Sequence, residues 1–151
     1  MTSKITWRWQ SWRELDADTL YTALRLRSDV FVVEQNCVYN DVDGLDPHCD
    51  HLCGVDERGR LLAYLRLLPP GVKYKEPSIG RVVVERDARK HGLARSAMLN
   101  GIRHCHERFP AQPILIQAQQ YLQGFYESLG FRAIGAPYIE DGIAHVDMRM
   151  S

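Results

Sequence analysis

The chain has 151 residues, and its 19 Lys and Arg balance its 19 Asp and Glu, so its formal net charge is zero. A balanced charge argues against nucleic acid or an anionic membrane as a partner, and a chain of this length usually forms one domain, here expected over residues 1–151. No apolar run approaches the roughly 20 residues that span a bilayer, and the polar N-terminus is unlike a secretion signal, which together predict a cytoplasmic protein.

The first predicted elements are a strand, a helix and a long loop. Residues 5–9 alternate apolar and polar side chains, which is typical of a strand. Asp18 is expected to cap a helix whose apolar positions continue to Phe31. Residues 35–50 are rich in Asn, Asp, Gly and Pro and predict an irregular loop. A loop of this length in a compact domain is more often functional than idle.

The middle of the chain predicts a hairpin, a buried strand and a helix. Residues 51–55 and 61–68 flank a polar connector that contains Gly, a pattern that predicts antiparallel pairing. Residues 79–84 include a run of β-branched Val and suit a strand buried on both faces. Small and apolar residues then recur at helical spacing, so a helix is predicted to begin at Gly92 and to end before Pro110.

The last third of the chain predicts a strand at residues 114–116 and a short helix at 121–128, which ends at Gly130. Two further strands are expected at 131–134 and 143–150. This order of elements favours an α/β fold built on one mixed sheet with helices on both faces.

Residues 89–94 form the turn between the buried strand and the central helix. Gly92 and Ala94 are small where a ligand would have to approach the backbone. The free N–H groups and the positive end of a helix dipole at this point can hold a pyrophosphate. Positive charge is added by Arg89, Lys90 and Arg95. Small residues at such a junction can also serve packing alone, so the turn by itself does not decide between the two interpretations.

Two motifs in order and at the expected spacing resemble the GNAT acetyltransferase superfamily. Residues 89–94, Arg-x-x-Gly-x-Ala, match its pyrophosphate loop, and residues 125–131, Phe-Tyr-Glu-Ser-Leu-Gly-Phe, match a second motif. Residues 31–37, 117–119 and 141–145 are similar to the ElaA-like branch. The resemblance implies the GNAT fold, a mostly antiparallel sheet with helices on both faces, and transfer of an acetyl group from acetyl-CoA to a primary amine by direct attack in a ternary complex.

The resemblance also assigns roles to residues. Tyr126 matches the general acid, and a backbone bulge in residues 82–84 would supply the oxyanion donor. The chain has Gln119 where many members have the Asn that contacts pantetheine, and Leu122 where they have Ala. The implied cofactor-binding residues are Val82, Val83, Val84, Arg89, Lys90, His91, Gly92, Leu93, Ala94, Arg95, Gln119 and Tyr126.

The group that takes the amine proton is left open among Glu34, Glu85, His51 and His145, of which Glu34 and His145 are retained as catalytic candidates. The acceptor is expected to be a small-molecule or peptide amine, and a homodimer through the last strands is compatible with the pattern. A second hypothesis is a catalytically silent acyl-CoA-binding module, which would have no need of Tyr126.

An acidic segment with Cys and His raises a metal-binding alternative. Its candidate ligands are Asp41, Asp43, Asp46, His48, Cys49, Asp50, His51 and Cys53. No second Cys/His pair has zinc-like spacing, so no metal is predicted and the four cysteines are expected to be free thiols. The favoured interpretation is a solvated acidic loop beside the acceptor, where its carboxylates would attract a cationic amine.

Overall fold

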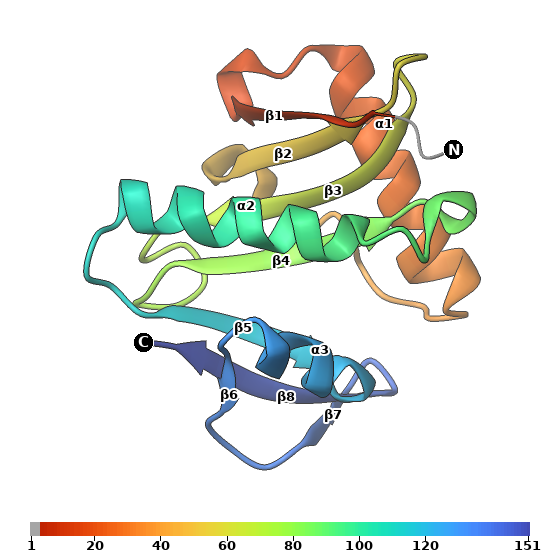
Figure 1. Cartoon of the computed structure of the whole chain (residues 1–151). Helices are drawn as coiled ribbons and strands as arrows, with labels where there is room; N and C mark the ends of the chain where they lie inside the picture. The colour runs from red at the N-terminus through yellow and green to blue at the C-terminus, as the bar shows by residue number, and fades with distance from the viewer. Residues whose placement is uncertain (1–3) are drawn as a thin grey trace.

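The computed structural model describes residues 4–151, whose strands all belong to one sheet (Figure 1). The strands are β1 (Thr6–Ser11), β2 (Asp50–Val55), β3 (Leu61–Leu68), β4 (Ser78–Val84), β5 (Ile114–Gln119), β6 (Arg132–Ala133), β7 (Tyr138–Glu140) and β8 (Ile143–Met150). Their order is β1-β2-β3-β4-β5-β8-β6, with β7 also paired to β8. Among the described pairs, β4 and β5 are parallel and the others are antiparallel, so the predicted mixed sheet is confirmed.

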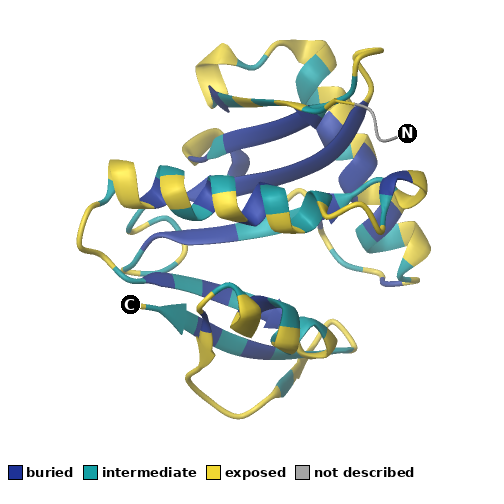
Figure 2. Ribbon diagram, in the orientation of Figure 1, coloured by how far each residue is buried: buried dark blue, intermediate teal, exposed yellow. Residues whose placement is uncertain are grey.

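Helices cover both faces of this sheet, as predicted. They are α1 (Ala17–Arg27), α2 (Leu93–Arg108) and α3 (Gln123–Ser128), and α1 continues into a π-helical turn, η2 (Ser28–Glu34). Successive side chains of a strand point to opposite faces. Leu65 and Leu67 of β3 therefore pack in the cluster that contains α2, while Tyr64 packs in the cluster that contains α1. Every residue of β3 is buried, which explains its nearly unbroken apolar sequence (Figure 2).

Two local predictions need correction. The cap of α1 is Asp16, whose carboxylate accepts a hydrogen bond from the Thr19 amide at 2.7 Å, whereas Asp18 lies in the first helical turn. An Asp two residues before the first-turn Asp was overlooked because both carboxylates suit a helix start. The short strand β7 was also missing from the prediction, since three residues of which two are exposed carry no clear alternation.

Strands β4 and β5 share one register pair among the described residues, Ser78 with Leu115. Beyond that pair the two strands separate, and the space between them widens along the sheet (Figure 1). Strand β4 also contains a bulge, because three steps from Gly80 to Val83 lie opposite two steps on β3. Arg81, inside the bulge, has a left-handed φ of 50°. A bulge was expected in this strand, and it begins one residue before residues 82–84.

The acidic loop is not solvated as predicted. Asp41 and Asp46 are buried, and both carboxylates pair with Arg27, a buried side chain of α1. The Arg27 guanidinium donates to Asp41 at 2.9 Å and to Asp46 at 2.7 Å. Arg66, from the middle of β3, donates to the same Asp46 oxygen at 2.9 Å. These carboxylates are therefore held as structural ion pairs and are not free to attract a substrate.

Arg81 extends the same network to the bulge of β4. Its guanidinium lies 2.8 Å from Asp41 and 3.4 Å from Asp43, and Asp43 also receives two hydrogen bonds from Arg66. Burial alone would raise the pKa of Asp43 and of Asp46, but hydrogen bonds and charge from the arginines lower both. The network ties the loop to α1, β3 and β4.

This network and the neighbouring His51 should make the fold sensitive to acid. His51 is buried between the Tyr64 hydroxyl and the Asp46 carbonyl, and burial lowers its pKa. Groups whose pKa is lowered on folding bind more protons when unfolded, so stability falls as pH drops below their unfolded values, about 6.5 for His and about 4 for Asp. We expect urea denaturation to give a free energy of unfolding that declines first below about pH 6.5 and more steeply below about pH 4.

A His51→Gln variant provides the control, since its side chain does not titrate. Its free energy of unfolding should lack the first decline while keeping the second. A wild-type stability that is unchanged from pH 8 to pH 4 would contradict the prediction.

Candidate active site

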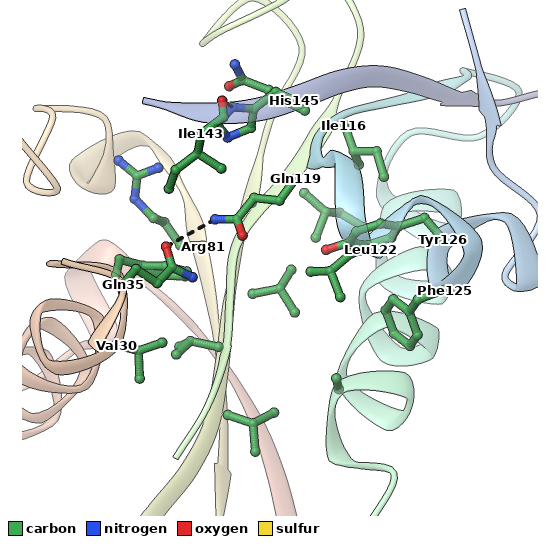
Figure 3. A pocket seen from close by; sticks show the side chains of 18 of the residues that line it. Val30, Gln35, Arg81, Ile116, Gln119, Leu122, Phe125, Tyr126, Ile143 and His145 are labelled. Carbon is green, nitrogen blue, oxygen red and sulfur yellow. Dashed lines mark hydrogen bonds between the residues drawn. The ribbon is translucent and has the colours of Figure 1, made fainter. Parts of the chain in front are cut away.

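A cavity of about 510 Å³ opens where β4 and β5 separate. Its walls come from both strands, the start of α2, α3, η2 and the β7–β8 turn. Figure 3 shows Leu122, Phe125 and Tyr126 on one wall, with Val30 and Gln35 across from them. Every cofactor-binding and catalytic residue named from the sequence lines this cavity, except His91, which is exposed and lies outside the described lining. The remaining proton-acceptor candidates, Glu85 and His51, also lie outside it.

One end of the cavity is the start of α2. Gly92 is the N-cap residue, with a left-handed φ of 75°, and within residues 4–151 no side chain caps the helix and no acidic residue occupies its first turn. A Cβ added at Gly92 would meet nothing within 4 Å, so the backbone here is open to a ligand. Unpaired N–H groups at a helix start favour an anion. Lys90 and Arg95 line the same end, and neither has a carboxylate within 4 Å in the described part of the chain.

Glu34 and Arg89 lie at this end as a pair. The Arg89 guanidinium donates to both carboxylate oxygens of Glu34, at 2.6 and 2.8 Å, and its Nε donates to the Val84 carbonyl at 3.2 Å. The hydrogen bond from Arg89 lowers the pKa of Glu34. A carboxylate whose two oxygens already accept from an arginine is a weak proton acceptor, so the structure favours a positioning role for Glu34, which ties the α2 loop to η2.

Tyr126 lies further along the cavity, on α3. The side chain is 8% exposed, and burial raises the pKa of its hydroxyl to about 12. Its ring packs edge-on against Phe125 and Phe131, with ring centres 5.1 and 6.2 Å away. A phenol held in this way keeps its proton at neutral pH and faces the cavity with a fixed orientation.

His145 and Gln119 are neighbours on the paired strands β8 and β5. The Gln119 amide donates to the Gln35 side chain at 3.2 Å and so links β5 to the end of η2 (Figure 3). His145 Nδ1 lies 2.8 Å from the Ile143 carbonyl, which accepts only if Nδ1 carries the proton. In the neutral ring Nε2 is then the nitrogen without a proton, which suits it to accept one.

Residues 47–151 match the family of the acetyltransferase (GNAT) domain, and ElaA from Escherichia coli is 38% identical over 146 residues, which is 95% of each chain. The chain belongs to the GNAT acetyltransferase family. Two solved structures agree with this GNAT fold. An acyl-CoA N-acyltransferase from Pseudomonas aeruginosa is 39% identical with a TM-score of 0.93, covering 98% of this chain and 100% of its own. Escherichia coli ElaA is 36% identical with a TM-score of 0.92, covering 98% and 100%.

The predicted GNAT membership and the ElaA-like resemblance are thereby confirmed, and the chain is a GNAT-type N-acetyltransferase. GNAT enzymes use an acyl-CoA donor and act on amine acceptors, which fits a cavity with an anion-binding end and a buried tyrosine. Among residues 4–151, no helix is long and apolar enough to cross a membrane.

Three aspartates of the metal-binding alternative, Asp41, Asp43 and Asp46, are paired with arginines. Within residues 4–151 no group of three or more His, Cys, Asp or Glu side chains is placed to hold a metal ion. The Cys49 thiol donates a hydrogen bond to the Leu45 carbonyl, and burial raises the pKa of this thiol to about 12. Cys37, Cys49, Cys53 and Cys105 are all free thiols, as predicted.

The lining residues that the sequence did not single out include Lys73, Gln117 and Glu140. Lys73 lies in the β3–β4 loop, where no periodicity singles it out, and Glu140 ends the unpredicted strand β7. Gln117 lies in a strand segment quoted only for its resemblance to the ElaA-like branch. These residues form the end of the cavity that the sequence motifs leave undescribed.

Proposed function

We propose that this enzyme transfers an acetyl group from acetyl-CoA to a primary amine by direct attack within a ternary complex. The observation that carries the proposal is one cavity that joins the open start of α2 to Tyr126 and His145. In direct attack the amine nitrogen bonds to the thioester carbon to give a tetrahedral oxyanion, and the carbon–sulfur bond breaks when this oxyanion collapses. Of the four cysteines only Cys37 lines the described cavity, and its thiol donates to the Asp141 carbonyl, which argues against a covalent acyl-enzyme.

Each step of the proposed transfer is assigned to a group that lines the cavity. Residues 92–95 would bind the diphosphate of CoA through backbone N–H groups, with charge from Lys90 and Arg95. A backbone N–H of residues 82–84, beside the β4 bulge, would donate to the oxyanion. His145 Nε2 would take the proton of the amine, directly or through water, and Tyr126 would give its proton to the leaving thiolate. Glu34 would act through Arg89, by holding the loop.

The domain bounds, the location and the oligomeric state of the enzyme are also part of the proposal. We infer that residues 1–151 form one domain, which is supported by a single sheet that contains every described strand. A cytoplasmic location and a homodimer stay predictions.

Release of free CoA from acetyl-CoA, measured over a panel of primary amines, tests the proposal directly. Turnover with at least one amine is the expected result. Tight binding of acetyl-CoA with no turnover of any amine would instead favour the silent binding module.

Replacing Gly92 with Val should weaken acetyl-CoA binding by at least about 10-fold. A β-branched residue at φ 75° is strained by about 1–3 kcal/mol, and its side chain would occupy the space where the diphosphate approaches. Calorimetric titration with acetyl-CoA gives the affinity, and thermal unfolding shows whether the variant is folded.

Gly59→Val is the matched control. Gly59 has a similar φ of 78° and open space around its Cβ, but it lies in the β2–β3 turn outside the cavity. It should therefore cost similar strain and leave acetyl-CoA affinity unchanged. Equal affinity in the wild type and a folded Gly92→Val variant would rule out this cofactor site.

A further inference from the structure

The end of the cavity away from α2 carries a lysine without a carboxylate partner. Lys73 lines it from the β3–β4 loop, and among residues 4–151 no carboxylate oxygen lies within 4 Å of its Nζ. Its hydrogen bond is to the side-chain oxygen of Gln117, at 3.0 Å. The positive charge of Lys73 is thus held at the cavity by a neutral group and is available to an anion.

Glu140 lies on the other side of the same amide. The Gln117 nitrogen donates to the Glu140 carboxylate at 2.6 Å, and within the described residues no cation lies within 4 Å of that carboxylate. Asp141, the next residue, also lines the cavity. One glutamine side chain therefore holds an unpaired positive charge and an unpaired negative charge apart at its two ends.

The arginines at this end are already neutralised. Arg66 and Arg81 line the cavity, but both are paired with the buried aspartates of the loop, Asp41, Asp43 and Asp46. A buried pair of this kind offers little net charge to a ligand. Among the described residues, Lys73, Glu140 and Asp141 are therefore the charged side chains of this end without an ion-pair partner within 4 Å.

The strand pairing places Glu140, but not Lys73, on the same hairpin as His145. Glu140 pairs with Ile143 in the β7–β8 hairpin, the hairpin that also presents His145, whereas Lys73 comes from the β3–β4 loop. An acceptor that pairs with both Glu140 and Lys73 has its amine on the side of the proposed proton acceptor, His145, and its anionic group near Lys73.

We infer that the acceptor is an amine that carries a carboxylate, of the α-amino acid kind. Its carboxylate pairs with Lys73, and its ammonium group is drawn to Glu140 before it loses a proton and attacks the thioester. The nitrogen–carbon bond forms first, and the carbon–sulfur bond breaks as the oxyanion collapses. The amine proton goes to His145 and the thiolate takes the Tyr126 proton, which leaves an N-acetyl amino acid and CoA. This inference rests on the proposed function, and it replaces the expectation that the acidic loop recognises the amine.

The test compares acceptors that differ by the carboxylate alone. Glycine, L-leucine and L-phenylalanine are paired with methylamine, isopentylamine and phenethylamine, with rates corrected for the fraction of neutral amine. For the wild type, kcat/KM should be at least about 10-fold higher for each amino acid, because an unpaired Lys73 penalises an acceptor without an anion. Lys73→Gln should remove that preference by raising KM for the amino acids, with KM for acetyl-CoA unchanged.

Lys75→Gln is the matched control, since Lys75 is an exposed lysine of the same loop outside the cavity lining. It should keep the preference for amino acids. If the decarboxylated amines react as well as the amino acids, or if Lys73→Gln keeps the preference, the inference is wrong while the proposed function stands. If neither set of acceptors releases CoA from an enzyme that binds acetyl-CoA, the inference is wrong, and the proposed function is contradicted only if the wider panel of primary amines also fails.

Discussion

Replacement of Tyr126 by Phe is expected to lower kcat by about 10²- to 10⁴-fold, or about 3 to 5 kcal/mol of transition-state stabilisation. The substitution keeps the ring that packs against Phe125 and Phe131 and removes only the hydroxyl. That hydroxyl has its pKa raised to about 12, so it still carries its proton when the thiolate forms. Affinity for acetyl-CoA should barely change, because the proton is given only as the thiolate leaves.

The measurement is kcat against pH for an amine that turns over, with acetyl-CoA affinity measured alongside. For the wild type, no alkaline fall in kcat caused by Tyr126 is expected up to about pH 10, which is well below its pKa of about 12. Tyr21→Phe, an exposed tyrosine of α1 outside the cavity, serves as the control. A Tyr126→Phe enzyme within about threefold of the wild-type kcat, with chemistry limiting, would reduce Tyr126 to a packing residue.

Replacement of Arg27 by Met should cost about 3 to 5 kcal/mol of unfolding free energy. The Met fills a similar volume but leaves the buried carboxylates of Asp41 and Asp46 without the guanidinium between them. An uncompensated buried charge is far more costly than the ion pair is worth, so the effect exceeds that of a core truncation of similar size. Urea denaturation at neutral pH measures the loss.

Arg25→Met gives the comparison on the same helix. Arg25 is paired with Asp29 at 3.9 Å, and both side chains are largely exposed, so the loss should be at most about 0.5 kcal/mol. If Arg27→Met costs no more than Arg25→Met, Arg27 contributes little to stability, and Asp41 and Asp46 are tolerated with Arg81 and Arg66 as their remaining partners.

Much of the fold could be predicted because local patterns and tertiary contacts agree. Strand β3 has an apolar sequence since each of its faces meets a helix, and α2 has one apolar stripe since it covers one face. The α2 loop was recognisable because an anion site at a helix start requires small residues at fixed positions, here Gly92 and Ala94. The sequence motifs thus name most of the residues that line the α2 end of the cavity.

The end of the cavity beside the acidic loop could not be predicted, because the residues that form it are distant in sequence. Arg27, Arg66 and Arg81 lie in three different elements, and their pairing with the loop became visible only in the folded chain. One signal was present, since an arginine inside the apolar run of residues 61–68 must find a carboxylate if that run is a buried strand. The position of Arg66 in this run therefore predicts that a carboxylate of the acidic loop pairs with it.

The single register pair between β4 and β5 has a consequence for how the folded state is maintained. Strands β1–β4 and β5–β8 are two halves of a sheet whose backbones meet at Ser78 and Leu115, so helix packing holds them together elsewhere. A ligand in the space between the halves bridges them and adds its binding free energy to folding, by an amount that grows with the logarithm of its concentration. An acyl-CoA bound in this space would therefore act as a removable part of the architecture, and its addition should raise the free energy of unfolding.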